Sequence, residues 1–400
     1  MKQKVFVVFY AQDRIGELVG QIWKLRNIFE DKKYQLIFIT PPVDHTPRIN
    51  NASYNIVMRG IHVLHSIDHN LLMQNLLDSK FPKSVLDSDS IFLLSHSTPL
   101  NLLFHDQFFN TKPIFYFSLT DSEKERGFDL KKKLGIKELN PIVTIHIRER
   151  NYIPSYKYHD YRNADLSNYI PAINYLIDNG FYVIRLGDKS MRPIINAPTQ
   201  LIDAPFHPEY SDFFDPYFVS ESKFFMGSPS GPLSLAWGFD IPILWTDVPI
   251  QAADGSPEND LVIYKKIYSK QLNRFLTYEE ILFSPIIDFY RQEYYDQCEL
   301  AIINNSKDEI LAATKEMIGR LNGSYKFYYE SKKIHHYIMS IHEKIRFLRQ
   351  NGRHSLINAN ALQKNVLNTI NCLFYSNSEL SYEFLKQNPF FLGHNFEMLL

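Results

Sequence analysis

Residues 141–151 have the sequence Pro-Ile-Val-Thr-Ile-His-Ile-Arg-Glu-Arg-Asn, and this stretch decides the fold that we predict. The apolar, partly β-branched run over 142–147 is typical of a buried strand. Because side chains alternate along a strand, His146 and Arg148 point to the same side at its carboxyl end. Ligands of open α/β sheets bind at that edge, so the segment is a candidate binding site.

Strand and helix patterns alternate on both sides of this strand, which predicts an α/β fold with parallel sheets. Before it, we expect strands at 5–10, 36–39, 55–58, 91–94 and 114–117, and helices at 15–29, 64–77, 100–108 and 121–134. After it, we expect strands at 182–186, 201–202, 224–226 and 241–245, and helices at 166–178, 213–220, 233–238 and 308–321. Two such runs predict two Rossmann-like, doubly wound domains facing a cleft.

Beyond residue 284 the strand pattern disappears, and the chain after 325 looks mostly helical. The predicted domains are therefore an N-terminal, acceptor-side Rossmann-like domain at 1–135, a ligand-binding Rossmann-like domain at 136–320, and a C-terminal helical extension at 321–400. A chain of 400 residues is long enough for two cores and an appendage.

Composition excludes several classes of protein. The net charge of −1 argues against a general nucleic-acid binder, which carries a basic excess. Two cysteines cannot form a disulfide framework or a Cys-rich zinc site. The apolar run near the N-terminus is too short for a signal peptide, and no stretch is long enough to span a membrane. We therefore expect a cytoplasmic protein.

The two arginines after the strand at 142–147 are candidate ligands for a diphosphate. Arg148 and Arg150 carry planar guanidinium groups, whose forked donors suit phosphate oxygens. The structural alternative is that they pair with nearby acids such as Glu149 or Asp160. The spacing alone leaves both interpretations open.

A second candidate is the turn Gly-Ser-Pro-Ser-Gly-Pro at 227–232, which follows a predicted strand and opens a predicted helix. Free backbone N–H groups at a helix N-terminus bind phosphate, and small residues allow close approach. Ser228, Ser230 and Gly231 are the residues we expect to contribute. The alternative is an ordinary helix cap with a proline near its start.

Two further segments contain polar residues at or near strand ends. In Arg-Leu-Gly-Asp at 185–188, Gly187 and Asp188 could meet the ribose or base of a nucleotide, or Asp188 could simply bond its own backbone. In Tyr-Arg-Asn-Ala-Asp at 161–165, Arg162 is a second candidate phosphate or sugar ligand.

The loop after the first strand holds the candidate general base. Asp13 or Glu17 could deprotonate an acceptor hydroxyl across a two-domain cleft, with Arg14 and Gly16 beside them on the acceptor side. The alternative is that these acids favour the N-terminus of the helix at 15–29 electrostatically.

We predict no bound metal and no cofactor. Asp-Ser-Asp at 87–89 resembles a metal-binding Asp-x-Asp motif, but it precedes a predicted strand instead of following one, which favours a solvated turn. No Gly-rich phosphate loop and no nucleophile elbow is present in the sequence.

Segment 326–353 is basic and amphipathic, with Lys and Arg outnumbering Glu. Such a segment could lie on an anionic membrane surface, which would place the protein at the inner membrane face. The alternatives are a helix packed on the second domain and a contact with a second copy in a homodimer.

Several of these segments, in order, resemble a family of bacterial glycosyltransferases with the two-domain GT-B fold. The resemblance covers about residues 1–320 and rests on the motifs at 13–16, 120–148, 161–165, 183–188, 225–231 and 276–282. The His-x-Arg at 146–148 is also similar to GDP-fucose-dependent fucosyltransferases, in which the Arg contacts the donor diphosphate. The chain departs from that pattern at Glu149 and Asn151, so GDP and UDP both stay open as the donor base.

The resemblance implies a glycosyltransferase that takes a GDP- or UDP-sugar and transfers the sugar to a glycan, lipid-linked or protein acceptor in bacterial surface glycan synthesis. By the fucosyltransferase resemblance, Arg148 takes the diphosphate role and the turn at 228–231 shares it. We hypothesise metal-independent displacement, in which Arg148 and Arg162 stabilise the leaving diphosphate, with His146 and Arg150 as further donor-binding candidates. Two alternatives stay open: a nucleotide-sugar 2-epimerase, and a non-catalytic nucleotide- or sugar-binding assembly protein.

Overall fold

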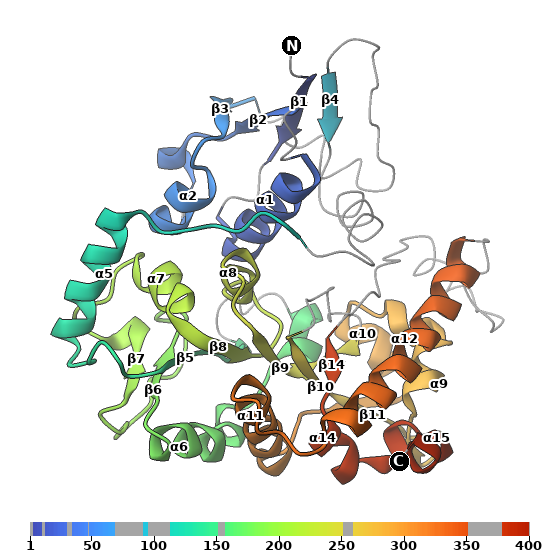
Figure 1. The fold of residues 1–400 in the computed structure, drawn as a ribbon. Coiled ribbons are helices and arrows are strands. Elements are labelled where there is room, and N and C mark those ends of the chain that lie inside the picture. The colour runs from blue at the N-terminus through green and yellow to red at the C-terminus, as the bar shows by residue number, and fades with distance from the viewer. Residues whose placement is uncertain are drawn as a thin grey trace. The chain divides into compact units, whose positions relative to one another are not determined.

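A computed structural model describes residues 3–9, 13–29, 34–46, 48–68, 91–94, 113–150, 157–250, 259–350 and 378–399. These residues group into two compact units. The first contains Met1–Asn140, His207–Ser222 and Gly231–Ile241, and the second contains Pro141–Phe206, Lys223–Ser230 and Pro242–Leu400. Figure 1 shows both units as ribbons.

The first unit contains a four-stranded parallel sheet in the order β3-β2-β1-β4. Its strands are β1 (Gln3–Val8), β2 (Tyr34–Thr40), β3 (His62–His65) and β4 (Ile91–Leu94). Its helices are α1 (Ile15–Phe29), α2 (Asn51–Val57), α5 (Asp121–Lys133), α7 (Phe214–Ser220) and α8 (Leu233–Gly238). Helices α1 and α8 pack together, and the Trp23 and Trp237 rings stack at 6.2 Å between centroids.

The second unit contains a seven-stranded sheet in the order β14-β10-β9-β8-β5-β6-β7. The strands are β5 (Ile142–His146), β6 (Tyr182–Arg185), β7 (Leu201–Asp203), β8 (Ser222–Gly227), β9 (Ile243–Val248), β10 (Leu261–Tyr264) and β14 (Glu379–Leu380). Strands β6 and β7 follow on one side of β5, and β8, β9 and β10 follow on its other side, so the strand order reverses between β5 and β8. The predicted α/β class with two doubly wound sheets is therefore confirmed.

Helix α11 (Lys307–Leu321) packs on β9, β10, α6 (Ile170–Asp178) and α14 (Tyr382–Gln387) (Figure 1). A small antiparallel sheet contains β11 (Lys266–Ser269), β12 (Arg274–Phe275) and β13 (Leu300–Ile303). The remaining helical elements are η1 (Val43–His45), η3 (Lys157–Arg162), η4 (Leu166–Asn168), η5 (Ala204–Phe206), α9 (Tyr278–Leu282), η7 (Pro285–Asp288), α10 (Gln292–Gln297), α12 (Tyr328–Gln350), η8 (Pro389–Phe391) and α15 (His394–Leu399).

Three predictions of local structure in the first unit were wrong. Residues 55–58 lie in and beside helix α2, because Asn50 caps that helix by accepting a hydrogen bond from the Ser53 N–H at 2.8 Å. Residues 64–65 belong to strand β3 and not to a helix. Segment 114–117 is not a strand, because the Asn27 side chain, from α1, accepts the N–H groups of residues 114 and 115.

Strands β10 to β13 were not predicted, and β13 and β14 lie beyond residue 284, where only helices were expected. The turn predicted at 87–89, the helix predicted at 100–108 and most of the helix predicted at 64–77 lie outside the described residues. The domain limits 1–135, 136–320 and 321–400 stay predictions.

The C-terminal part is helical as predicted, in α12, α14 and α15, and it also supplies the edge strand β14. Buried charges join it to helix α11 of the same unit: Arg320 donates to Glu316 and Glu379, each at 2.7 Å, and Glu379 also pairs with Lys332. This segment is therefore part of the core of its unit.

The apolar face of α12 is buried. Ile334, Ile338, Ile341 and Ile345 are all at most 5% exposed, at the spacing of one helix face. This packing favours the interpretation of 326–353 as a helix packed on the second domain, and a peripheral membrane contact stays a prediction. Within the described ranges, none of the helices has the length and apolarity needed to cross a bilayer.

An N-cap supports the start of α11. Ser306 Oγ accepts from the Glu309 N–H at 3.2 Å, and the Glu309 carboxylate accepts from the Ser306 N–H at 2.7 Å. We expect Ser306→Ala to lower the free energy of unfolding by about 1 kcal/mol. Urea denaturation measures the change. Lys307→Ala, at the next exposed position, is the control, and an equal loss in both variants would contradict the capping role.

Candidate functional site

The carboxyl ends of β5 and β8 meet where the strand order of the second unit reverses. The Arg148 N–H donates to Ser228 Oγ at 2.8 Å, and the Ser228 N–H donates to the His146 carbonyl at 3.2 Å. A Cβ on Gly227 would lie 2.2 Å from the same carbonyl, so only glycine permits this approach. In doubly wound sheets ligands bind in the crevice at this reversal point.

Arg148 is a half-buried cation without a carboxylate partner among the described residues. Its Nε atom is buried and has no hydrogen-bond partner. Burial, and then repulsion from Arg162, lowers the pKa of Arg148 to about 10. The guanidinium therefore stays protonated at neutral pH, with donors available for an anion.

Arg162, at the end of η3, is the second cation of this edge. Its Nη2 atom donates to the carbonyl of Pro229 at 3.0 Å, and its buried Nε atom has no hydrogen-bond partner. Arg162 therefore contacts the turn after β8, while Arg148 contacts Ser228 in the same turn. The two guanidinium groups repel each other, and the nearby carboxylate of Asp160, which acts electrostatically on Arg148, is hydrogen-bonded to Arg150 and Asn163. Such a pair of cations suits a multivalent anion.

His146 lies at the same edge as a neutral group. Its Nδ1 atom lies 3.0 Å from the Leu186 carbonyl oxygen, so Nδ1 carries the proton in this contact. Burial lowers the pKa of His146 to about 4. The remaining nitrogen, Nε2, can then only accept a hydrogen bond, and at neutral pH His146 adds no positive charge.

Arg150 pairs with a nearby acid, which was the structural alternative to a diphosphate contact. Its side chain is exposed and pairs with Asp160, with Nε donating at 3.1 Å. The donor-binding role predicted for Arg150 therefore has less geometric support than that of Arg148 or Arg162.

Glu149 and Arg185 form a buried ion-pair cluster that sequence reasoning missed. Arg185 is fully buried and donates to Glu149 at 3.0 Å and to Asp203 at 3.1 Å. The cluster joins the ends of β5, β6 and β7. The sequence shows Arg185 as one charged residue in an otherwise apolar strand, and nothing in it indicates that Arg185 pairs with Glu149 and Asp203, which are 36 and 18 residues away.

Gly187 and Asp188 follow β6. Gly187 has φ +149°, and a Cβ there would lie 1.9 Å from the sulfur of Met191. Asp188 accepts from the Ser190 N–H at 2.7 Å, which is the backbone-bonding alternative. Contact with a nucleotide stays a prediction for both residues.

Ser230 and Gly231 complete the turn after β8. Ser230 is half-buried, and Gly231 packs against Gly16 within the first unit: a Cβ on Gly16 would lie 2.8 Å from the Gly231 Cα. Close packing of α1 against α8 thus explains both glycines. Because α8 has only six residues, its dipole adds little to the anion site.

The candidate base lies in the first unit. Glu17, in the first turn of α1, accepts from the Gln21 side chain at 2.6 Å, and Asp13 is half-buried in the preceding turn. Arg14 is exposed beside them. Roles for Asp13, Arg14, Gly16 and Glu17 in catalysis or acceptor binding stay predictions.

Lys265 is a third cation near the strand ends that the sequence did not indicate. It follows β10, is 2% exposed, and donates to the Asn163 carbonyl at 2.5 Å and to Asn304 Oδ1 at 2.7 Å. Its electrostatic interaction with Arg148 places its charge near the anion site.

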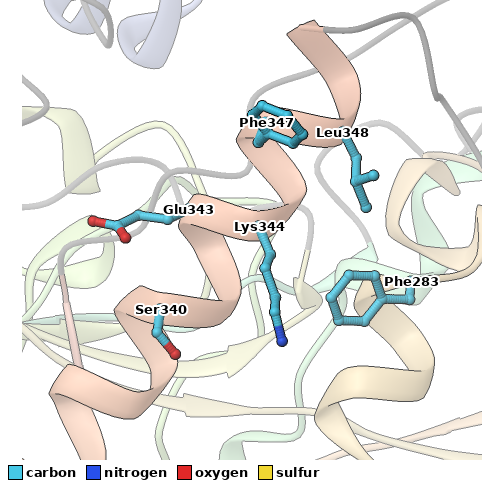
Figure 2. A pocket seen from close by; sticks show the side chains of 6 residues that line it. All are labelled: Phe283, Ser340, Glu343, Lys344, Phe347 and Leu348. Atoms are coloured by element: carbon cyan, nitrogen blue, oxygen red, sulfur yellow. The ribbon is translucent and has the colours of Figure 1, made fainter.

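An open hollow lies between Phe283, just after α9, and the second half of α12 (Figure 2). Ser340, Glu343, Lys344, Phe347 and Leu348 line its α12 side. It shares no lining residue with the Arg148–Arg162 site. Across the described parts of the chain, there is no group of three or more His, Cys, Asp or Glu side chains that could hold a metal.

No family model and no curated protein sequence matches the chain. Solved structures do resemble it. A glycosyl transferase family 9 protein from Veillonella parvula has TM-score 0.39 and 10% identity, over 66% of this chain and 86% of the other.

Two E. coli structures are similar at the same level. ADP-heptose lps heptosyltransferase II has TM-score 0.34 and 11% identity, over 61% of this chain and 84% of its own. Heptosyltransferase WaaC, solved with ADP-2-deoxy-2-fluoro heptose, has TM-score 0.36 and 12% identity, over 65% and 92%. Likenesses of this strength leave family and activity to be argued from the residues of this chain.

Proposed function

We propose that the protein is a metal-independent glycosyltransferase of the GT-B type, which transfers a sugar from a nucleoside-diphosphate donor. One observation carries the proposal: Arg148 and Arg162 lie together at the reversal point of a doubly wound sheet, each with an unpartnered Nε. Such an arrangement favours a diphosphate, because its two phosphates can accept from both guanidinium groups.

The chemistry follows from these charges. When the bond between the anomeric carbon and the phosphate oxygen breaks, the sugar acquires oxocarbenium character and the diphosphate gains negative charge. Fixed guanidinium groups stabilise that charge where other transferases use a metal ion. The acceptor hydroxyl attacks the anomeric carbon and loses its proton to a base, for which Glu17 and Asp13 are the candidates.

A side-chain hydroxyl at the same edge supports the same assignment. Ser228 Oγ accepts from the Arg148 N–H, and its hydroxyl proton would be donated to a phosphate oxygen. Ser230, Gly231, Gly187 and Asp188 would contact the remainder of the donor. The acceptor would be a glycan, a lipid-linked sugar or a protein, and the site of action the cytoplasm or the inner membrane face.

A thermal-shift panel of UDP, GDP, CDP and dTDP sugars tests donor binding. At a concentration 100 times its Kd, the right donor stabilises the fold by about 2.7 kcal/mol, which raises Tm by several degrees. We expect one nucleotide to stand out and the shift to persist in EDTA. No shift with any nucleotide would contradict the proposal.

Product analysis then separates the alternatives. Nucleoside diphosphate release that depends on an added acceptor supports transfer. Release without acceptor indicates a 2-epimerase, and binding without any turnover indicates a non-catalytic assembly protein.

A further inference from the structure

One buried ammonium, that of Lys265, joins the loop after Arg162 to the turn that precedes α11. Lys265 Nζ donates to the Asn163 carbonyl, one residue after Arg162, and to the Asn304 side chain, just before α11. The Asn163 side chain in turn donates to Asp160 at 2.9 Å. The Ala164 N–H donates to the Arg148 carbonyl at 3.0 Å, which links the same loop to the first cation.

The lysine is held in place by a polar network that is itself buried. Asp247, at the end of β9, has φ +51° and is fully buried; its carboxylate accepts from the Asn305 N–H at 2.7 Å and from the Tyr169 hydroxyl at 2.8 Å. A non-glycine residue in this conformation indicates that the surrounding structure determines it. The network therefore fixes the position of the 304–305 turn to which Lys265 is bonded.

We infer that Lys265 is a positioning residue of the donor site, which holds the Arg162 loop at the reversal point so that both guanidinium groups face one diphosphate. This inference rests on the proposed function. Two of the three N–H donors of the ammonium are used by the Asn163 carbonyl and Asn304. Its positive charge, close enough to act on Arg148, also adds to the field that attracts the anion.

The charge state of Lys265 gives a specific readout. Burial lowers the pKa of Lys265, Asp247 partly offsets this effect and Arg148 adds a smaller decrease, so that the pKa of Lys265 is about 8. Tyr169 and Glu309 are the other titratable groups facing Asp247, and burial raises the pKa of Asp247. Arg148, with a pKa of about 10, stays charged through pH 8, and His146, with a pKa of about 4, is already neutral.

As pH rises through 8, Lys265 loses its proton and with it the charged hydrogen bonds that hold Asn163. Because its pKa is lower in the folded than in the unfolded chain, this lysine makes the fold more stable, not less, as pH rises from 8 toward 10.5. If donor binding weakens at alkaline pH, unfolding caused by the deprotonation of Lys265 is therefore not the explanation.

The test is calorimetric titration with UDP and with GDP from pH 7.5 to 9.5, where the phosphates of both probes are fully ionised. We expect the affinity of the wild-type protein to fall about tenfold across this range, and Lys265→Met to show the weaker affinity at every pH. Asn304→Asp places a carboxylate on the ammonium and raises its pKa, so the fall should move to higher pH. A purely structural role would not move that midpoint.

If neither UDP nor GDP binds, hydrogen exchange of the unliganded protein still tests whether Lys265 positions the Arg162 loop. Lys265→Met should increase exchange in the peptide that covers 160–165, while Lys270→Met, at an exposed position after β11, should not. Absence of UDP and GDP binding would count against the proposed function alone. Unchanged exchange at 160–165, or equal midpoints in the wild type and Asn304→Asp, would overturn the role of Lys265.

Discussion

Replacing Arg148 with alanine is expected to weaken binding of the nucleoside-diphosphate donor about a hundredfold. Each charge-assisted hydrogen bond to a phosphate contributes about 1.5–3 kcal/mol. The buried Nε of Arg148 has no hydrogen-bond partner in the protein, so alanine would remove bonds made to the donor and no side-chain bond within the protein at this atom. Titration calorimetry with the nucleotide that gives the largest thermal shift measures the change. Arg148→Lys keeps the charge but loses the planar fork, so we expect an intermediate loss of about tenfold.

Folding of the Arg148→Ala variant should be preserved. The contact that joins β5 to the turn after β8 is made by the backbone N–H of Arg148, which alanine retains. Removing the side chain also relieves its repulsion with Arg162. Lys223→Ala is the control, because this exposed lysine lies on β8 at the opposite end of the strand. A folded Arg148→Ala protein with wild-type donor affinity would remove the basis of the transferase proposal.

Gly227→Ala is expected to lower the free energy of unfolding by about 3 kcal/mol, the upper end of the cost of overpacking. The new Cβ would lie 2.2 Å from the His146 carbonyl oxygen and 3.1 Å from its carbon, and these are backbone atoms that cannot rotate away. The ends of β5 and β8 must therefore separate. Donor affinity should fall as well, because Arg148 and the turn at Ser228 would move apart. Chemical denaturation and calorimetry measure the two effects.

Gly319→Ala provides the matched control for that substitution. The nearest atoms to its new Cβ lie at 3.5–3.6 Å, an ordinary contact distance, and Gly319 lies within helix α11. Alanine there should raise stability by up to about 1 kcal/mol, as helix propensity predicts. A Gly227→Ala protein as stable as the wild type would show that the strand ends are not packed as closely as described.

The sequence was sufficient for elements with local determinants. Helix α5 lies where a helix was predicted, at 121–134: the Thr120 hydroxyl caps its start by accepting from the Glu123 N–H, and Gly135 follows its end with φ +70°. Strand β5 and the turn after β8 were placed correctly, and their shared sheet edge followed from topology alone. Apolar pattern and strand ends thus predicted which segments share one edge of the sheet, and the role of their residues in binding stays a prediction.

What the sequence did not predict depends on partners far apart in the chain. The extended segment after residue 113 bonds to Asn27, which is 87 or more residues earlier. Lys265 interacts with partners 102 and 39 residues away, and it follows the apolar strand β10, where nothing marks it as buried. Side-chain hydrogen bonds of this kind have no periodicity, so only three-dimensional structure reveals them.

Strand β14 has a practical consequence for anyone who shortens this chain. A protein cut after Leu321 would lose β14 from the seven-stranded sheet, and β10, still paired with β9, would become the edge strand. The uncovered N–H and C=O groups of β10 would then offer a template for other chains, and the carboxylate of Glu316 would lose the Ser381 hydroxyl that donates to it at 2.7 Å. Recombinant versions that end near residue 320 should therefore aggregate, and residues 379–400, which begin with β14, should be kept in a shortened protein.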